Sequence, residues 1–369
     1  MIPDSYAEPK KQKLLDNEHK EEHRKTVQQT QVKRGKKQRT RTEKDDSGEP
    51  AAPELSDHRT KSEKTNKEYQ TKDTPCSSQE PTYPCLDPAP TSISRIDLPS
   101  SDIISLLVDS TLRLVFMADV ENESIKVTDL SLKLIYELRL GFKPRGLALS
   151  FDRKQLYVTS QEECKIVVID VENKRELDGS INTSKPYWGI GTWDDKTLVV
   201  SYSGYSGKHG KPSVDVITVS GLKVTVIRTL CTPDVLEPHY LSVHSGKVFI
   251  SDRHHDKSCV YVVDLITGEL TETLKHALLQ SPCQVCTDHG GNLYVASHKG
   301  QCVLKHLTAN RQWLEVARGP TDNAHPKCVS VAGTRLLVSW GKFGNASSVL
   351  QAYNMSPASS VQLGVVRKS

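Results

Sequence analysis

Residues 155–160 read QLYVTS, an apolar β-rich run that ends in small polar residues, and this pattern occurs six times in the chain. The other five copies read LVFMAD (114–119), TLVVSY (197–202), KVFISD (247–252), NLYVAS (292–297) and RLLVSW (335–340). Their central residues follow one another at intervals of 41, 42, 50, 45 and 43 residues. A nearly fixed period in this range is typical of repeat architectures.

Three more strands are expected on the same period. A strand often opened by proline precedes each copy, and a strand of alternating pattern follows it, as in KIVVIDV (165–171). A fourth strand follows in most repeats, as in LKVTVIRTL (222–230). No helical period lies between them, so each repeat predicts a four-stranded antiparallel meander.

One such sheet cannot bury both of its faces, so the repeats must stack, and radial stacking gives a propeller. The sequence therefore predicts an all-β fold, a six-bladed β-propeller of four-stranded antiparallel blades over residues 92–369. A seven-bladed ring would need a hidden blade, for which the chain has no room. We expect ring closure to pair either residues 92–98 or residues 359–366 with the opposite end of the chain.

Residues 1–91 are expected to be a disordered charged tail and Pro-rich linker. Residues 1–92 contain no Phe and no Trp, so few side chains there offset the entropy of ordering the backbone. The tail holds a basic cluster of Lys33, Arg34, Lys36, Lys37, Arg39 and Arg41. Such a cluster is read as a nuclear import signal, as an arm that touches phosphates, or as a solvated charge run.

Composition excludes several classes. The sequence contains no apolar run of about 18 residues, so it predicts no transmembrane helix. Its N-terminus lacks the apolar region of a signal peptide. The nine cysteines are irregularly spaced and are expected to be reduced thiols. We therefore expect a cytoplasmic protein, or a nuclear one if the basic cluster acts as an import signal. The net charge of +4 does not by itself indicate a nucleic acid or a membrane as partner.

The repeats resemble NHL-type repeats in three segments: PRGLALSFDRKQLYVTS (144–160), EPHYLSVHSGKVFISDRHHDKSCVYVVDLITGEL (237–270) and SPCQVCTDHGGNLYVAS (281–297). More narrowly, they look like the C-terminal propellers of invertebrate tripartite-motif proteins. That resemblance implies a recognition module. The RING, B-boxes and coiled coil of those proteins have no match here, because residues 1–92 hold only Cys76, Cys85, His19, His23 and His58 as zinc-ligand types. Ubiquitin ligase activity is therefore not implied.

Three motifs could suggest other chemistry. Cys283 and Cys286 form a CxxC on an expected inner strand, where structural cysteines are the simpler interpretation. The Gly-rich loop 203–212 lacks the spacing of a phosphate-binding Walker loop. His254, His255 and Asp256 would need a further ligand from another blade. We expect no metal, no cofactor and no catalytic residues.

The residues that follow the opening prolines are predicted to ring one mouth of the central channel. These channel-mouth residues are Arg145, Tyr187, Trp188, His239, Tyr240, Gln284 and Lys327. The ring is cationic and aromatic, unlike the carboxylate ring of calcium-dependent propeller hydrolases. It predicts a non-enzymatic, monomeric recognition scaffold for a protein partner, with no membrane partner. Single-stranded RNA is the alternative ligand, and a metal-dependent propeller hydrolase or lyase is the less favoured one. A third interpretation is that the aromatics pack between blades.

Overall fold

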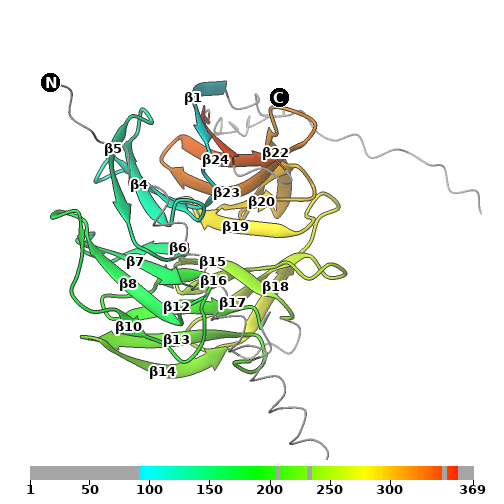
Figure 1. Cartoon of the computed structure of the whole chain (residues 1–369). Coiled ribbons are helices and arrows are strands. Elements are labelled where there is room, and N and C mark those ends of the chain that lie inside the picture. Colours follow the sequence, from blue (N-terminus) through cyan, green and yellow to red (C-terminus); the bar gives the residue numbers. More distant parts are fainter. Residues whose placement is uncertain (1–90, 161, 205–207, 231–234, 343–346, 356–369) are drawn as a thin grey trace, which may run out of the picture. The chain divides into compact units, whose positions relative to one another are not determined.

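The computed structural model describes residues 91–160, 162–204, 208–230, 235–342 and 347–355, which belong to one compact unit of the chain. These residues form strands and turns and no helix, so nothing in this part of the chain meets the length and apolarity of a membrane-spanning helix. The strands make six antiparallel sheets around a common centre (Figure 1). The predicted six-bladed propeller is confirmed. The tail and its basic cluster, Lys33 to Arg41, lie outside the described residues.

The first three blades follow the predicted repeats in order. Blade 1 consists of β2 (Ile103–Asp109), β3 (Leu114–Asp119), β4 (Ser124–Asp129) and β5 (Leu134–Arg139). Blade 2 consists of β6 (Pro144–Leu149), β7 (Gln155–Ser160), β8 (Lys165–Asp170), β9 (Arg175–Glu176) and β10 (Ile181–Asn182). Blade 3 consists of β11 (Ile190–Thr192), β12 (Thr197–Tyr202), β13 (Ser213–Ser220) and β14 (Lys223–Leu230).

The last three blades complete the ring. Blade 4 consists of β15 (Pro238–His244), β16 (Lys247–Asp252), β17 (Cys259–Asp264) and β18 (Leu270–Leu274). Blade 5 consists of β19 (Pro282–Thr287), β20 (Leu293–Ser297), β21 (Cys302–Leu307) and β22 (Gln312–Arg318). Blade 6 consists of β23 (Ala324–Ala332), β24 (Arg335–Lys342), β25 (Ser347–Asn354) and β1 (Thr91–Pro99). The first strands face the centre, and each contacts the first strands of both neighbouring blades.

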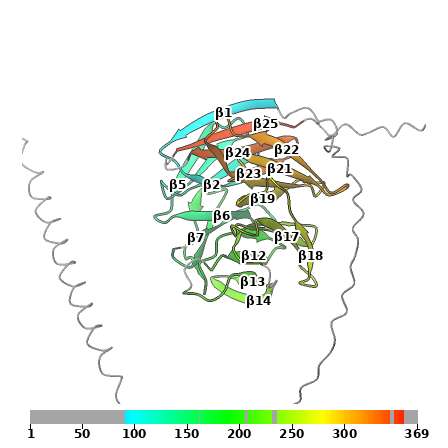
Figure 2. The same ribbon diagram turned by 90° about the vertical axis from the view of Figure 1, so that its right-hand side faces the viewer.

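The ring is closed by the N-terminal strand. β1 pairs antiparallel with β25, with Ile96 opposite Leu350, and the two strands run side by side at the edge of the molecule (Figure 2). Of the two closures that the sequence left open, this is the first; residues 359–366 lie outside the described residues. Pairing strands from both ends of the described chain covers the outer edge of β25 and supplies the fourth strand of blade 6.

The fourth position of blade 2 departs from the simple meander. β9 and β10 are both two-residue strands and both pair with β8. Gly179, between them, has a φ of +89°, a left-handed conformation that glycine adopts at little cost. The turn there breaks the outer strand into two pieces.

The core lies between the blades rather than within one sheet. Phe116 and Ile125 of blade 1 pack against Leu156 and Val167 of blade 2 in a buried cluster. Five further clusters join the other neighbouring blades in the same way. Each β-strand presents side chains to both sides, so each sheet is buried by the sheets next to it. This interlocking fixes the ring on which the channel mouth is built.

Candidate functional site

A pocket of about 480 Å³ opens at the end of the ring where the first strands begin. One part of its wall comes from first strands and the turns before them: Asp102, Ile104, Arg145, Trp188, His239, Tyr240, Cys283, His325 and Lys327. The other part comes from the ends of second strands and the loops after them: Glu121, Arg253, His298, Gly341 and Lys342. Its volume lies in the range of small-molecule and side-chain binding sites. We call it the channel-mouth pocket.

Irregular strand pairing points the wall residues into this pocket. In five blades the pairing of first and second strands shifts register at the mouth: between Ile103 and Ser105, Pro144 and Leu147, Pro238 and Leu241, Pro282 and Val285, and Pro326 and Cys328. Consecutive residues of a regular strand face opposite sides, yet His239 and Tyr240 both line the pocket. The bulge permits this, as bulges beside functional sites commonly do.

Hydroxyl groups at the ends of the repeated second strands hold the bulges in place. Thr159 accepts a hydrogen bond from the Gly146 N–H at 2.8 Å and donates to the Trp188 carbonyl of the next blade at 2.7 Å. Ser201 repeats the arrangement one blade on, between the Gly189 N–H and the carbonyl of His239. In blades 2 and 3, the small polar residue near the end of the repeat unit therefore ties mouth residues of neighbouring blades together.

Side chains that cross the channel close it beneath the mouth. The Tyr240 hydroxyl of blade 4 donates to the Ile104 carbonyl of blade 1 at 2.7 Å. Gln284 of blade 5 binds both backbone groups of Leu106: its amide donates to the carbonyl at 2.7 Å and its oxygen accepts from the N–H at 2.9 Å. These bonds place side chains of blades 4 and 5 across the channel, and they form a floor beneath the mouth.

Three adjacent blades form a stacked wall. The Arg145 guanidinium lies over the Trp188 ring at 4.3 Å, and the His239 ring lies 4.1 Å from the same indole. Arg145 Nε and His239 Nδ1 are buried and have no hydrogen-bond partner among the described residues. His239 is only 5% exposed. Buried polar atoms without a partner are uncommon and costly, so these two nitrogens are unsatisfied polar groups in the residues that line the pocket.

The charge of the wall is predominantly positive. Lys327 pairs with Asp102 at 2.6 Å, and its side chain passes over Gly341, where a Cβ would collide with it. Among the described residues no carboxylate pairs with Arg145 or Arg253, both half-buried. The Arg253 Nε donates to the Ser281 hydroxyl at 3.0 Å. The pocket therefore carries two guanidinium charges that nothing in its own wall neutralises.

Burial and the positive charge of the wall lower the pKa of two histidines of the pocket, His239 and His298. Burial lowers the pKa of His239 well below its usual range, and the charges of Arg253 and Arg145 lower it further. Burial, with Arg253 as the largest charge contribution, lowers the pKa of His298 to about 4. Both imidazoles are therefore neutral at physiological pH, and each offers one N–H donor and one acceptor.

The lowered pKa of His298 predicts acid-dependent stability. The unfolded histidine titrates at about pH 6.5, whereas His298 in the folded state titrates at about pH 4. Between these two pH values the unfolded state binds a proton that the folded state does not bind. The free energy of unfolding should fall by about 1.4 kcal/mol per pH unit for this group, or roughly 3 kcal/mol in all. Urea unfolding followed by Trp fluorescence measures it. His298→Gln should lose clearly less stability over this range, and equal losses in both proteins would contradict the assignment.

Five of the seven predicted channel-mouth residues line the pocket: Arg145, Trp188, His239, Tyr240 and Lys327. The structure does not bring Tyr187 or Gln284 to its wall. Tyr187 is 2% exposed, packs between blades 2 and 3, and donates its hydroxyl to Asp215 at 2.8 Å. The side chain of Gln284 is hydrogen-bonded to the backbone N–H and carbonyl of Leu106 instead. The third interpretation, packing of aromatics between blades, holds for Tyr187.

Sequence reasoning missed several wall residues, chiefly Arg253, His298, His325 and Lys342. Arg253 and His298 directly follow the repeat units KVFISD and NLYVAS. First strands begin and second strands end at the same edge of an antiparallel blade. The residue that follows each repeat unit could therefore have been predicted from the sequence to lie at the channel mouth.

The other motifs contribute little to the pocket. Cys286 is half-buried against the cluster between blades 5 and 6, while Cys283 is buried at the pocket wall; both are free thiols. Residues 205–207 of the Gly-rich loop lie outside the described residues.

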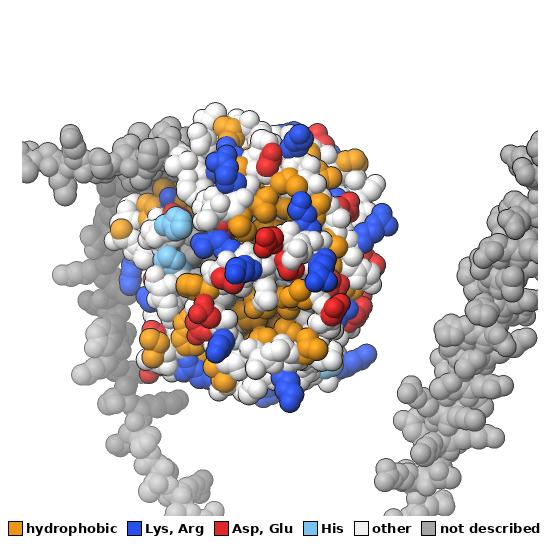
Figure 3. Space-filling model, turned by 90° about the vertical axis from the view of Figure 1, so that its left-hand side faces the viewer, with side chains coloured by type: hydrophobic (Ala, Val, Ile, Leu, Met, Phe, Trp, Pro, Cys, Tyr) orange, Lys and Arg blue, Asp and Glu red, His pale blue; other side chains and the backbone are white. Residues whose placement is uncertain are grey.

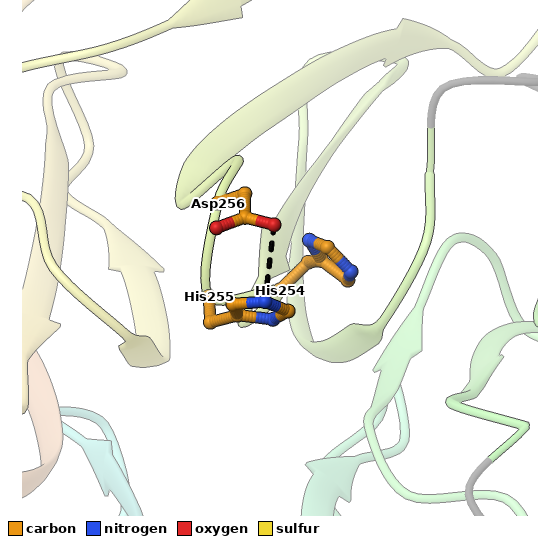
Figure 4. A group of neighbouring side chains, drawn as sticks. All are labelled: His254, His255 and Asp256. Atoms are coloured by element: carbon orange, nitrogen blue, oxygen red, sulfur yellow. Dashed lines mark ion pairs between the residues drawn. The ribbon is translucent and has the colours of Figure 1, made fainter.

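His254, His255 and Asp256 gather their side chains in the loop after β16 (Figure 4), with candidate ligand atoms within 4.8 Å of one another. His255 pairs with Asp256 at 3.0 Å, and both side chains are 72% exposed. His254 is half-buried, so only two of the three side chains are exposed, and all three come from one loop.

Comparison with known proteins supports the fold. No protein-family model matches the chain, and no curated protein matches it in sequence. Among solved structures, the RRP9 WD40 repeats match with a TM-score of 0.54 and 13% identity over 72% of this chain and 99% of that one. A catalytically inactive virginiamycin B lyase from Staphylococcus aureus, with quinupristin, matches with a TM-score of 0.50 and 16% identity over 72% and 90%. At such identities these likenesses show a β-propeller and nothing about activity.

Proposed function

We propose that this chain is a non-enzymatic recognition scaffold that binds a protein partner by taking an acidic side chain into the channel-mouth pocket. The observation that carries the proposal is a pair of half-buried guanidiniums in the pocket wall, Arg145 and Arg253, which no carboxylate of the described residues pairs with. Keeping a partly desolvated cation unpaired costs free energy. A partner's carboxylate or other anion would recover that cost on binding, which gives both affinity and selectivity.

Within this proposal a protein ligand is favoured over the alternative of single-stranded RNA, although the basic cluster Lys33 to Arg41 lies outside the described residues. RNA recognition of this kind needs aromatic faces on which bases stack. Arg145 and His239 already contact the Trp188 ring, and Tyr240 is buried with its hydroxyl bonded across the channel. Figure 3 shows the side of the molecule that lies at the left in Figure 1, and on that side Lys and Arg are interspersed with Asp and Glu rather than forming a continuous basic track. These features favour a protein ligand.

The finer family assignment stays a prediction from the sequence. The NHL-type identity of the repeats and the likeness to tripartite-motif propellers rest on the quoted segments. The monomeric state and cytoplasmic location have the same status. The rival hydrolase or lyase predicts a tightly bound divalent ion, so a stoichiometric metal in elemental analysis of the purified protein would contradict the scaffold proposal.

The test compares two randomised fluorescent peptide pools of equal length, one with a fixed central Glu and one with a fixed central Gln. We expect the full chain to bind the Glu pool at least about tenfold more tightly by anisotropy, a difference of about 1.4 kcal/mol. Arg145→Gln should remove that preference because it removes an unpaired cation from the wall.

The matched control is Arg113→Gln. Arg113 is exposed in the turn after β2, at the opposite end of the blade from the pocket, and its substitution changes the net charge equally. It should retain the preference for Glu. Equal affinity for both pools would overturn the proposal. So would binding of a random RNA pool that Arg145→Gln abolishes and Arg113→Gln does not.

A further inference from the structure

We infer that the acidic group recognised by the channel-mouth pocket is a phosphomonoester, a phosphorylated side chain of the protein partner, rather than a carboxylate. This inference rests on the proposed function and deepens it. It follows from three properties of the pocket: its charge, its hydrogen-bond donors and its closed floor.

The charge of the pocket matches a dianion. The wall holds four cationic side chains and two carboxylates, Asp102 and Glu121. Lys327 is neutralised by Asp102, while Lys342 and Glu121 are exposed. The guanidiniums of Arg145 and Arg253 are half-buried and have no carboxylate partner in the part of the chain that the structure describes. A carboxylate would balance one of these two charges, whereas a phosphomonoester carries a charge of about −1.5 to −2 at pH 7 and would balance both.

The donors of the pocket come from separate blades. Arg145 Nε from blade 2 is a buried donor without a partner among the described residues, and His239 Nδ1 from blade 4 is a buried nitrogen in the same condition. Arg253 adds the terminal nitrogens of its guanidinium, since its Nε is bonded to Ser281. A phosphomonoester presents three terminal oxygens that point in different directions, and guanidiniums bind such oxygens in pairs. A planar carboxylate has only two oxygens and meets fewer of these donors.

The closed floor separates a phosphomonoester from a nucleic-acid backbone. The bonds from Tyr240 to Ile104 and from Gln284 to Leu106 cross the channel, so a ligand enters only by its end. A phosphorylated side chain ends in its phosphate. The phosphodiester of an RNA backbone is esterified at two oxygens and carries one charge. Because it is not a chain end, it cannot enter a closed pocket first.

The experiment adds a phosphoserine pool to the Glu and Gln pools, with identical randomised flanks, and uses the full chain. We expect the phosphoserine pool to bind at least about tenfold more tightly than the Glu pool. Arg145→Gln and Arg253→Gln should each weaken that binding at least about tenfold, while Arg113→Gln should not. Circular dichroism at the same temperature checks that each variant is folded. Inorganic phosphate, added as a competitor, should displace the pool only at far higher concentration, because it lacks the peptide contacts.

Each other outcome is decisive. Equal binding of the phosphoserine and Glu pools overturns the phosphate inference and leaves acidic recognition standing. Phosphoserine binding that survives both arginine substitutions places the site elsewhere and overturns the inference. Inorganic phosphate that binds as tightly as the peptide pool makes the ligand a small phosphate and overturns the protein source. Failure of both acidic pools overturns the proposed function together with the inference.

Discussion

Gly189→Ala is expected to lower the free energy of unfolding by about 3 kcal/mol, and the melting temperature by roughly 10 °C. A Cβ at this position would lie 2.7 Å from the His239 carbonyl oxygen, 2.7 Å from the Ser201 hydroxyl and 3.0 Å from the Tyr240 Cα. Two of these atoms belong to the backbone of the next blade, so they cannot rotate away. The methyl group would force blades 3 and 4 apart and break the bonds through Ser201. Thermal melting followed by circular dichroism measures the effect.

Gly290→Ala is the matched control. Gly290 lies in the turn between β19 and β20, and its nearest atoms are side-chain atoms of Asp288 and Asn292 at 3.3 and 3.4 Å. Both side chains can move, so the substitution should change stability by less than about 1 kcal/mol. If the two variants melted alike, the close approach of blades 3 and 4 at Gly189 would not be a determinant of stability.

Asp215→Ala is expected to cost about 3 kcal/mol of stability, at the lower end of the range for breaking a buried ion pair. Asp215, on β13, is fully buried and binds the Lys185 ammonium and the Tyr187 hydroxyl, each at 2.8 Å. Thr229 donates to its other oxygen at 2.7 Å. Alanine would leave these donors without an acceptor. Because Lys185 and Tyr187 lie three residues and one residue before Trp188, the variant should also weaken binding of the Glu pool.

Two further variants define the Asp215 effect. Tyr187→Phe removes a single hydrogen bond and should cost about 1 kcal/mol. Asp195→Ala removes an exposed carboxylate from the turn before β12 and should stay within about 0.5 kcal/mol of the wild type. Urea unfolding of the four proteins gives the ranking. A cost for Asp215→Ala no larger than that for Asp195→Ala would show that the buried network adds nothing to stability.

The architecture could be read from the sequence because it depends on local and periodic properties. The runs around Phe116, Tyr157 and the four later centres make short strands, and their near-constant spacing gives the number of blades. Each centre lies in the second strand of its blade. The closing strand was named among two alternatives, since a propeller must join its ends, but choosing β1 required its actual partner, β25.

The pocket was only partly predictable. Proline marks where several first strands begin, so Arg145, His239 and Lys327 could be placed at the mouth from the sequence. The orientation of the neighbouring side chains could not. The register shifts at the mouth change which residues face the channel. No local sequence pattern that we identified predicts these shifts.

The roles of Tyr187 and Gln284 were decided by distant partners. Tyr187 binds Asp215, 28 residues away, and Gln284 binds Leu106, 178 residues away. Both have the residue types of a binding surface, and both are used to hold the ring together. Likewise, whether Arg145 and Arg253 find a carboxylate partner among the described residues depends on what the folded ring places around them. A strand is specified by its own residues, whereas the free or occupied state of a polar group depends on which segments the closed ring brings within hydrogen-bond distance.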